Sequence, residues 1–277
     1  MRHLREIHPE RPSPDQANAF PFTVPTIASL AGGVLRLPTE VTLFVGENGS
    51  GKSTLLEALA CAIGSITVGS EGVADDASLA HVRPLADSLR LIWNVKTRRG
   101  FFLRAEDFFG YARRMSQLRA EMEAEAQRIR EDPTLTRVQR GQALMPYGRE
   151  LGAMQRSYGA GLDAASHGES FLALFQSRFV PNGLYLLDEP EAPLSPMRQL
   201  ALLALIQQCV VTQGAQFVIA THSPLLMALP QATIYNFQDG QVTPITYDES
   251  EHVRFLRDFL NAPQRYLRPL LEDEGTR

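Results

Sequence analysis

Residues 41–54 read VTLFVGENGSGKST and decide the fold of this chain. The β-branched run Val41–Val45 predicts a buried strand, and the apolar-periodic stretch Thr54–Ile63 predicts a helix. The turn between them fits G-x-x-x-x-G-K-[ST], a loop whose backbone amides cradle phosphate oxygens. A chance match is disfavoured because the strand and the helix flank the loop. The residues expected to bind nucleotide are Gly46, Glu47, Asn48, Gly49, Ser50, Gly51, Lys52, Ser53 and Thr54.

Lys52 and Ser53 supply the charge and the metal ligand that this loop needs. The lysine is expected to reach the β- and γ-phosphates of ATP, and the serine hydroxyl to bind Mg²⁺. The N-terminus of the following helix adds its partial positive charge. Lys52 and Lys96 are the only lysines in a chain that otherwise uses arginine, so arginine would be hard to substitute at Lys52.

A second motif is the sequence LYLLDEP at residues 184–190, an apolar strand that ends in two carboxylates. Asp188 is expected to hold Mg²⁺, directly or through water. Glu189 is expected to orient and polarise the water that attacks the γ-phosphate. A merely solvated loop is the alternative, and the loop at residues 46–54 makes it less favoured.

A histidine follows the next buried strand, Gln216–Ala220, in the sequence THSP. A lone histidine is more often structural than catalytic. His222 ends the strand that follows the carboxylate pair along the chain, where its ring could contact the γ-phosphate, and this favours a catalytic function.

The pentad SHGES, residues 166–170, opens a predicted helix upstream of the carboxylate pair. Ser166 and Gly168 at a helix N-terminus would make a second anion site. The pentad is uninformative by itself, and a helix cap is the alternative. Its position relative to the other motifs favours the anion site.

Composition describes an ordinary soluble globular protein. The chain has 277 residues, 44% hydrophobic and 21% charged, with a formal net charge of -4 that gives no overall signal for nucleic-acid binding. The two cysteines, Cys61 and Cys209, lie in apolar helical contexts, which favours a reducing compartment. No apolar run is long enough to span a membrane, so we expect a cytoplasmic protein without an integral membrane segment.

The order of motifs predicts one α/β domain over residues 1–277, with a mostly parallel core sheet, an antiparallel β part and a helical insertion at about 110–161. The insertion is dense in Arg, Glu and Ala. Residues 89–95 and 101–103 read as two strands of a hairpin, and so do residues 233–237 and 241–245.

Together, these motifs resemble the ABC-type ATPase superfamily of P-loop NTPases. The nearest match within it looks like the small stand-alone bacterial ATPases loosely called AAA-type, which share heads with recombination and chromosome-maintenance ATPases. Shorter matches extend the resemblance over most of the chain. They are FPF at 20–22, GFFLRAE at 100–106, DFLN at 258–261 and RYL at 265–267.

The resemblance implies ATP and Mg²⁺ as ligands and a homodimer in the ATP-bound state. ABC heads bind ATP on one subunit and close it with the signature segment of another. Ser166 and Gly168 would then contact the γ-phosphate bound at Lys52 of the partner subunit.

Two departures from the superfamily pattern matter. The signature reads SHGES where transporters have LSGGQ, which argues against a transporter subunit. The glutamine that usually completes the magnesium coordination is not found, because no glutamine occurs between the P-loop and Arg104.

We therefore favour an ATPase motor or switch that acts on a protein or DNA partner. The alternative is the nucleotide-binding subunit of an ABC transporter, which would need a membrane-docking segment where this chain has a strongly charged insertion. A kinase is less favoured, because Glu189 and His222 fit water as the acceptor. A protein that only binds nucleotide is disfavoured because Glu189 is intact.

The Lys52→Ala variant should lose ATP binding and turnover together, because the lysine neutralises phosphate charge in both the ground state and the transition state. Calorimetric titration with Mg-ATP measures the affinity. Equal affinity of the variant and the wild type would refute the assignment of the loop.

Overall fold

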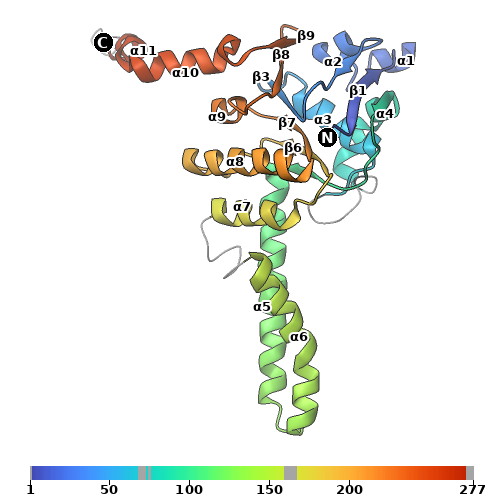
Figure 1. The fold of residues 1–277 in the computed structure, drawn as a ribbon, viewed down its shortest axis with the longest axis vertical. Helices are drawn as coiled ribbons and strands as arrows, with labels where there is room; N and C mark the ends of the chain where they lie inside the picture. The colour runs from blue at the N-terminus through green and yellow to red at the C-terminus, as the bar shows by residue number, and fades with distance from the viewer. Residues whose placement is uncertain (1, 68–72, 74–75, 159–166, 273–277) are drawn as a thin grey trace.

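A six-stranded sheet forms the centre of the computed structural model, which describes residues 2–67, 73, 76–158 and 167–272 (Figure 1). The first five strands run parallel and the last is antiparallel, so the expected mostly parallel sheet is confirmed. In spatial order the strands are β5 (Phe102–Arg104), β6 (Leu184–Asp188), β7 (Gln216–Ala220), β3 (Val41–Gly46), β8 (Thr233–Gln238) and β9 (Gln241–Ile245). The hairpin expected at residues 233–245 is the β8–β9 pair.

A smaller antiparallel sheet lies beside it, in the order β2 (Leu35–Arg36), β1 (Leu4–Pro9) and β4 (Leu89–Trp93). The hairpin expected between residues 89–95 and 101–103 is wrong. β4 pairs with β1, whereas β5 pairs in parallel with β6. The physical reason is burial on both faces: all three residues of β5 are buried, as is typical of a strand in a parallel sheet covered on both sides.

Side chains alternate along each central strand and feed two apolar cores, one on each face of the sheet. In β3, Leu43 and Val45 belong to one core, and Phe44 to the other. The helix α3 (Lys52–Ile63) covers the core around Phe44. The helices α7 (His167–Arg178) and α8 (Pro196–Gln213) cover the opposite face (Figure 1).

The remaining helices are short or lie at the edges. They are α1 (Pro14–Ala17), α2 (Pro25–Leu30), η1 (Ala77–Val82), α4 (Arg83–Asp87), α9 (Pro224–Met227), η2 (Tyr247–Glu249), α10 (Glu251–Asn261) and α11 (Pro263–Glu272). The pair α10–α11 extends from the body at the C-terminal end (Figure 1). In the ranges given above, no helix combines the length and the apolar character needed to cross a membrane.

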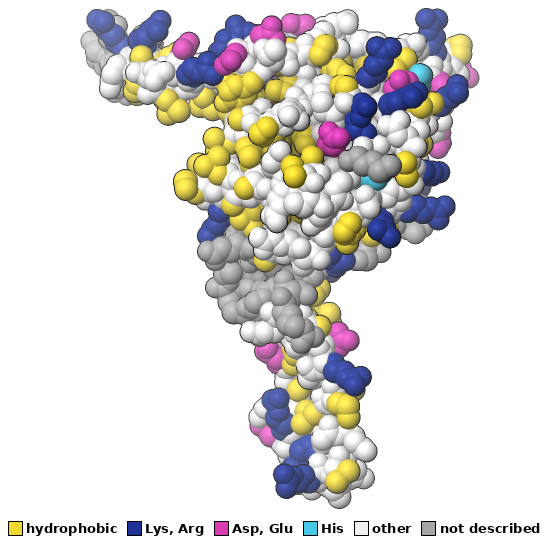
Figure 2. Space-filling model, viewed as in Figure 1, with side chains coloured by type: hydrophobic (Ala, Val, Ile, Leu, Met, Phe, Trp, Pro, Cys, Tyr) yellow, Lys and Arg dark blue, Asp and Glu magenta, His cyan; other side chains and the backbone are white. Residues whose placement is uncertain are grey.

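A long helical hairpin projects from the other side of the molecule (Figure 1). It consists of α5 (Ala105–Glu131), which begins where β5 ends, and α6 (Arg137–Tyr158). Its surface carries both signs of charge (Figure 2). Pairs such as Arg119 with Glu123, at 2.9 Å, follow the helical i,i+4 spacing, which stabilises an exposed helix modestly.

The turn into β5 depends on Gly100, which has a φ of 113°. A Cβ there would lie 1.8 Å from the carbonyl oxygen of Leu184 on β6. Any side chain at this position would therefore separate the two strands, and β6 is the strand that ends in Asp188.

We expect Gly100→Ala to lower the melting temperature, because strained backbone alone costs about 1–3 kcal/mol and the clash adds to it. Gly141→Ala is the matched control. A Cβ on Gly141 in α6 meets no atom within 4 Å, and alanine favours a helix over glycine by about 0.5–1 kcal/mol. The melting temperature should thus fall for Gly100→Ala and rise for Gly141→Ala. A wild-type melting temperature for Gly100→Ala would contradict the claim that the turn into β5 requires glycine.

Candidate functional site

The loop after β3 is shaped by three glycines with positive φ, at 141° for Gly46, 77° for Gly49 and 98° for Gly51. A Cβ on Gly46 would lie 2.3 Å from the carbonyl oxygen of Phe237, and one on Gly51 would lie 2.6 Å from Thr26 Oγ1. The backbone therefore turns tightly against β8 and α2, and glycine is required at both positions.

Lys52 begins α3 and lies beneath this loop, only 4% exposed. Its Nζ donates hydrogen bonds to the carbonyl oxygens of Gly46 at 3.0 Å and Glu47 at 2.8 Å. Burial lowers the pKa of Lys52, while the carboxylates of Glu189 and Asp188 oppose that shift. A buried ammonium group held at the base of a glycine loop is well placed to neutralise phosphate charge.

The hydroxyl of Ser53, in the first turn of α3, contacts the carboxylate of Asp188, at the end of β6. Ser53 Oγ donates a hydrogen bond to Asp188 Oδ1 at 3.0 Å, although 135 residues separate them in sequence. Asp188 is 8% exposed, and burial raises its pKa to about 7, with Glu57 and Glu189 adding to the rise. A cation at this carboxylate would offset the cost of its charge.

These two side chains fit Mg²⁺. Mg²⁺ prefers oxygen ligands and is usually bound by one or two carboxylates together with substrate phosphates and water. Among the residues that the structure describes, no group of three or more His, Cys, Asp or Glu could hold a metal by itself. A site completed by nucleotide phosphates is consistent with that, and Ser53 and Asp188 would be its protein ligands.

Glu189 follows Asp188 with a positive φ of 48°, and its side chain is 43% exposed. Its Oε1 lies 3.5 Å from Nε2 of His222, which comes directly after β7 and Thr221. Burial lowers the pKa of His222, and nearby Lys52 lowers it further, so the ring is favoured in its neutral form. Nε2 is buried and has no hydrogen-bond partner among the described residues.

A second buried polar atom without a partner in the described chain belongs to the loop itself, Ser50 Oγ. Buried polar atoms are normally satisfied. Phosphate oxygens of a bound nucleotide would supply partners for both Ser50 and His222. The structure thus brings together Lys52, Ser53, Asp188, Glu189 and His222 at one end of the parallel strands.

The signature segment is only partly described. Ser166 lies outside the described residues, and Gly168 lies in the first turn of α7. Figure 1 shows α7 on the opposite side of the sheet from α3, the helix that carries Lys52. The structure therefore does not bring Gly168 to the other site residues of the same chain.

The strand next to Asp188 ends in Arg104, a residue that the sequence reasoning did not select. Arg104 pairs in register with Asp188 and is buried, with ion pairs to Asp107 at 2.8 Å, Asp76 at 3.3 Å and Glu57 at 3.5 Å. The end of β5, next to Asp188, is thus occupied by an arginine. The stretch between the P-loop and this arginine contains no glutamine that could complete the magnesium coordination. The buried context of the sequence FFLR could have drawn attention to Arg104.

A second missed residue is Glu191, two positions after Glu189. It is buried, and its Oε1 accepts hydrogen bonds from the loop that carries His222. Burial raises the pKa of Glu191, and the hydrogen bond from Thr221 opposes that rise. The sequence DEPE at residues 188–191 shows an acidic residue at position 191, but it does not show that the partners of Glu191 lie in the loop after β7.

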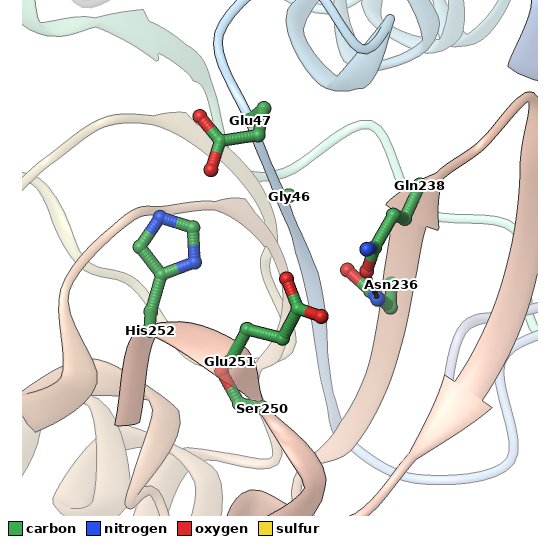
Figure 3. Close-up of a pocket in the computed structure, with 7 residues that line it drawn as sticks. All are labelled: Gly46, Glu47, Asn236, Gln238, Ser250, Glu251 and His252. Carbon is green, nitrogen blue, oxygen red and sulfur yellow. Dashed lines mark hydrogen bonds between the residues drawn. The ribbon is translucent and has the colours of Figure 1, made fainter. Parts of the chain in front are cut away.

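The start of α10 also reaches the loop, which the sequence did not predict. A small cavity of about 20 Å³, room for about one water molecule, lies beside the loop (Figure 3). Glu251 and His252 at the start of α10 turn towards it from one side, and Glu47 from another (Figure 3). The lining residues are Gly46, Glu47, Asn236, Gln238, Ser250, Glu251 and His252.

Two family models match the chain. One is described as an AAA domain and matches residues 27–144, which include the glycine loop. The other is described as an AAA domain, putative AbiEii toxin, Type IV TA system, and matches residues 169–228, which include Asp188, Glu189 and His222. No curated protein matches the sequence.

Solved structures with similar chains include ATP-binding cassettes. One is MJ1267, an ATP-binding cassette of an ABC transporter in its ADP conformation, with 16% identity, 88% of this chain and 90% of that chain covered, and a TM-score of 0.46. Another is a putative metal-chelate type ABC transporter in an inward-facing conformation, with 17% identity, 78% and 75% coverage, and a TM-score of 0.42.

The Asp188→Asn variant should lose about two orders of magnitude in turnover, about 2.7 kcal/mol of barrier, because Mg²⁺ loses its carboxylate. Phosphate release measured against Mg²⁺ concentration checks this. Wild-type turnover in the variant would contradict the assignment of Asp188.

The nucleotide-free Asp188→Asn variant should also melt at a higher temperature than the wild type at pH 8. The folded-state pKa of Asp188, about 7, exceeds the usual 3.8, so the wild type loses stability as pH rises from about 4 through 7.

Proposed function

We propose that this chain, whose sequence matches AAA-domain models over residues 27–144 and 169–228, is an ABC-type ATPase that acts as a nucleotide-driven switch and pairs with a second copy when ATP is bound. The chain binds and hydrolyses ATP, as its two AAA-domain matches indicate. The main support for the residue assignments is one contact, the 3.0 Å hydrogen bond from Ser53 to Asp188, with Glu189 and His222 beside it.

In this proposal, Lys52 neutralises the β- and γ-phosphates of ATP, and the amides of residues 46–54 cradle them. Ser53 and Asp188 hold Mg²⁺, which neutralises charge on the β- and γ-phosphate oxygens when it is bound. The orphaned Nε2 of neutral His222 donates a hydrogen bond to a γ-phosphate oxygen.

Glu189 orients the attacking water in the same proposal. Its carboxylate is partly exposed, so water can reach it. The water oxygen forms the new bond to the γ-phosphorus, the bond to the oxygen bridging the β- and γ-phosphates breaks, and the water proton passes to Glu189. The products are ADP and inorganic phosphate. A carboxylate suits this function because it accepts a hydrogen bond without repelling the water.

Pairing of two copies is supported by the location of the signature helix. α7 covers the face of the sheet opposite to α3, so Gly168 in its first turn is better placed to meet a nucleotide on another copy. A two-fold arrangement gives two equivalent sites, each capped by the partner's signature. ADP lacks the γ-phosphate, so hydrolysis loosens the pair and couples chemistry to motion.

The hairpin α5–α6 separates this proposal from a transporter subunit. It joins β5 to the segment that carries the signature, the position at which a transporter ATPase docks its membrane protein. Here it is a long projection with ion pairs such as Arg128 with Glu125 at 2.9 Å. We infer that it docks a protein or DNA partner in the cytoplasm, where free cysteines such as Cys61 and Cys209 stay reduced.

The Glu189→Gln variant tests the switch. It should bind ATP but hydrolyse it at least about two orders of magnitude more slowly, since the water loses its carboxylate. Light scattering should then show a monomer without nucleotide or with ADP, and a dimer with Mg-ATP.

The matched control adds Ser166→Arg to Glu189→Gln, which should leave ATP binding intact and block the dimer. A monomeric mass for Glu189→Gln at saturating Mg-ATP would contradict ATP-driven pairing. If the double variant dimerises as readily as its parent, SHGES is only a helix cap.

A further inference from the structure

One buried carboxylate beside the catalytic groups has no function in the mechanism above. Glu191 is 9% exposed and lies in the loop between β6 and α8. Its Oε1 accepts three hydrogen bonds, from Thr221 Oγ1 at 2.6 Å, His222 N at 2.7 Å and Ser223 N at 3.1 Å. All three donors belong to one short segment, the loop that follows β7.

This loop needs an acceptor because it has left the sheet. β7 ends at Ala220, and the backbone amides of His222 and Ser223 donate to Glu191 instead of to a neighbouring strand. A buried amide without a partner is costly. A single carboxylate oxygen satisfies both amides and the threonine hydroxyl, and so fixes three consecutive residues at once.

Among the described residues, no hydrogen bond holds the Nε2 end of the histidine ring, and its one ring contact is an edge contact with His252, with centroids 5.7 Å apart. His222 Nε2 has no hydrogen-bond partner in the described chain, and the carboxylate oxygen of Glu189 lies 3.5 Å away. The direction of the ring therefore depends largely on the backbone of residue 222. That backbone is held by Glu191 on one side.

The far side of the same loop is fixed by α8. Ser223 Oγ donates to Gln199 Oε1 at 2.6 Å and accepts from the amides of Leu225 and Leu226, which caps α9. Gln199 in turn donates to the carbonyl oxygen of Leu194. The loop after β6 and the loop after β7 thus form one hydrogen-bonded unit.

We propose that Glu191 is a positioning residue, which holds the backbone of His222 so that the ring faces the γ-phosphate and stays in register with Glu189. The inference rests on the proposed function of His222. Glu191 does not touch substrate in this account. It acts through the histidine, and its own loop also carries the catalytic glutamate two residues earlier.

A general structural function would require Glu191 to stabilise the fold at large. Burying a carboxylate is expensive, and no ion pair to Glu191 is found in the described part of the chain, so hydrogen bonds alone offset the cost. An apolar residue would stabilise a core more simply. One oxygen of the carboxylate, Oε1, instead serves three donors of the His222 loop, while Oε2 is buried without a hydrogen-bond partner among the described residues.

A double-mutant cycle tests the proposal, with kcat and KM for ATP measured for Glu191→Ala, His222→Ala and the combination. Glu191→Ala should lower kcat by about tenfold to a hundredfold, because a displacement of about 1 Å is enough for such a loss. KM should change by less than about threefold. In the His222→Ala background, Glu191→Ala should change kcat by less than about threefold.

Two variants serve as internal comparisons. Glu191→Gln keeps an acceptor oxygen and should recover most of the kcat lost in Glu191→Ala. Glu123→Ala removes an exposed carboxylate on α5 and should leave kcat unchanged. If Glu191→Ala fails to fold, Thr221→Val removes one of the three donors, and its smaller loss of kcat should likewise vanish in the His222→Ala background.

Each remaining outcome overturns a defined claim. An equal fall in kcat in both backgrounds, or an unchanged kcat in Glu191→Ala, would overturn the positioning function alone. If His222→Ala itself leaves kcat unchanged, the assignment of His222 is wrong and the positioning function falls with it.

Discussion

The parallel register of three strands is the constraint on which the rest of this structure depends. Asp188 on β6 pairs with Ala220 on β7, and Ala220 pairs with Phe44 on β3. β6 and β7 therefore end at the same level, and β3 continues two residues further, to Gly46, so that the loops after the three strands share one edge of the sheet. That edge receives the glycine loop, the carboxylate pair and His222. A shift of one strand's register by one residue would turn the side chains of that strand to the opposite faces of the sheet, and would also separate these groups.

Electrostatics at this edge explains why a nucleotide is needed to complete it. Burial penalises the charged forms of Lys52 and Asp188, so it lowers the pKa of Lys52 and raises the pKa of Asp188. Lys52 interacts electrostatically with the carboxylates of Glu189, Asp188 and Glu47. Phosphates with Mg²⁺ bring charges of both signs, which compensate the lysine and the aspartate together. The folded protein thus holds an arrangement of charges that is more favourable with its ligand than without it.

Local sequence was sufficient to predict the strands and the loop that carry the short motifs of the candidate site. The glycine loop, the strand ending in Asp188 and the strand before His222 are all found where they were predicted. Sequence failed where tertiary pairing decides. Residues 89–103 contain two strand-like runs, but only the structure shows that they join different sheets. Arg104 and Glu191 were missed for the same reason, since their partners lie far away in the chain.

One structure determination tests the central claim most directly, that of the Glu189→Gln protein with Mg-ATP. The account predicts phosphates at Lys52, a metal ion about 2.0–2.1 Å from Ser53 Oγ, and Asp188 bound to that ion directly or through one water. It also predicts a γ-phosphate oxygen about 2.7–3.2 Å from His222 Nε2. A nucleotide bound away from Lys52, or a metal ion with neither Ser53 nor Asp188 beside it, would contradict the account.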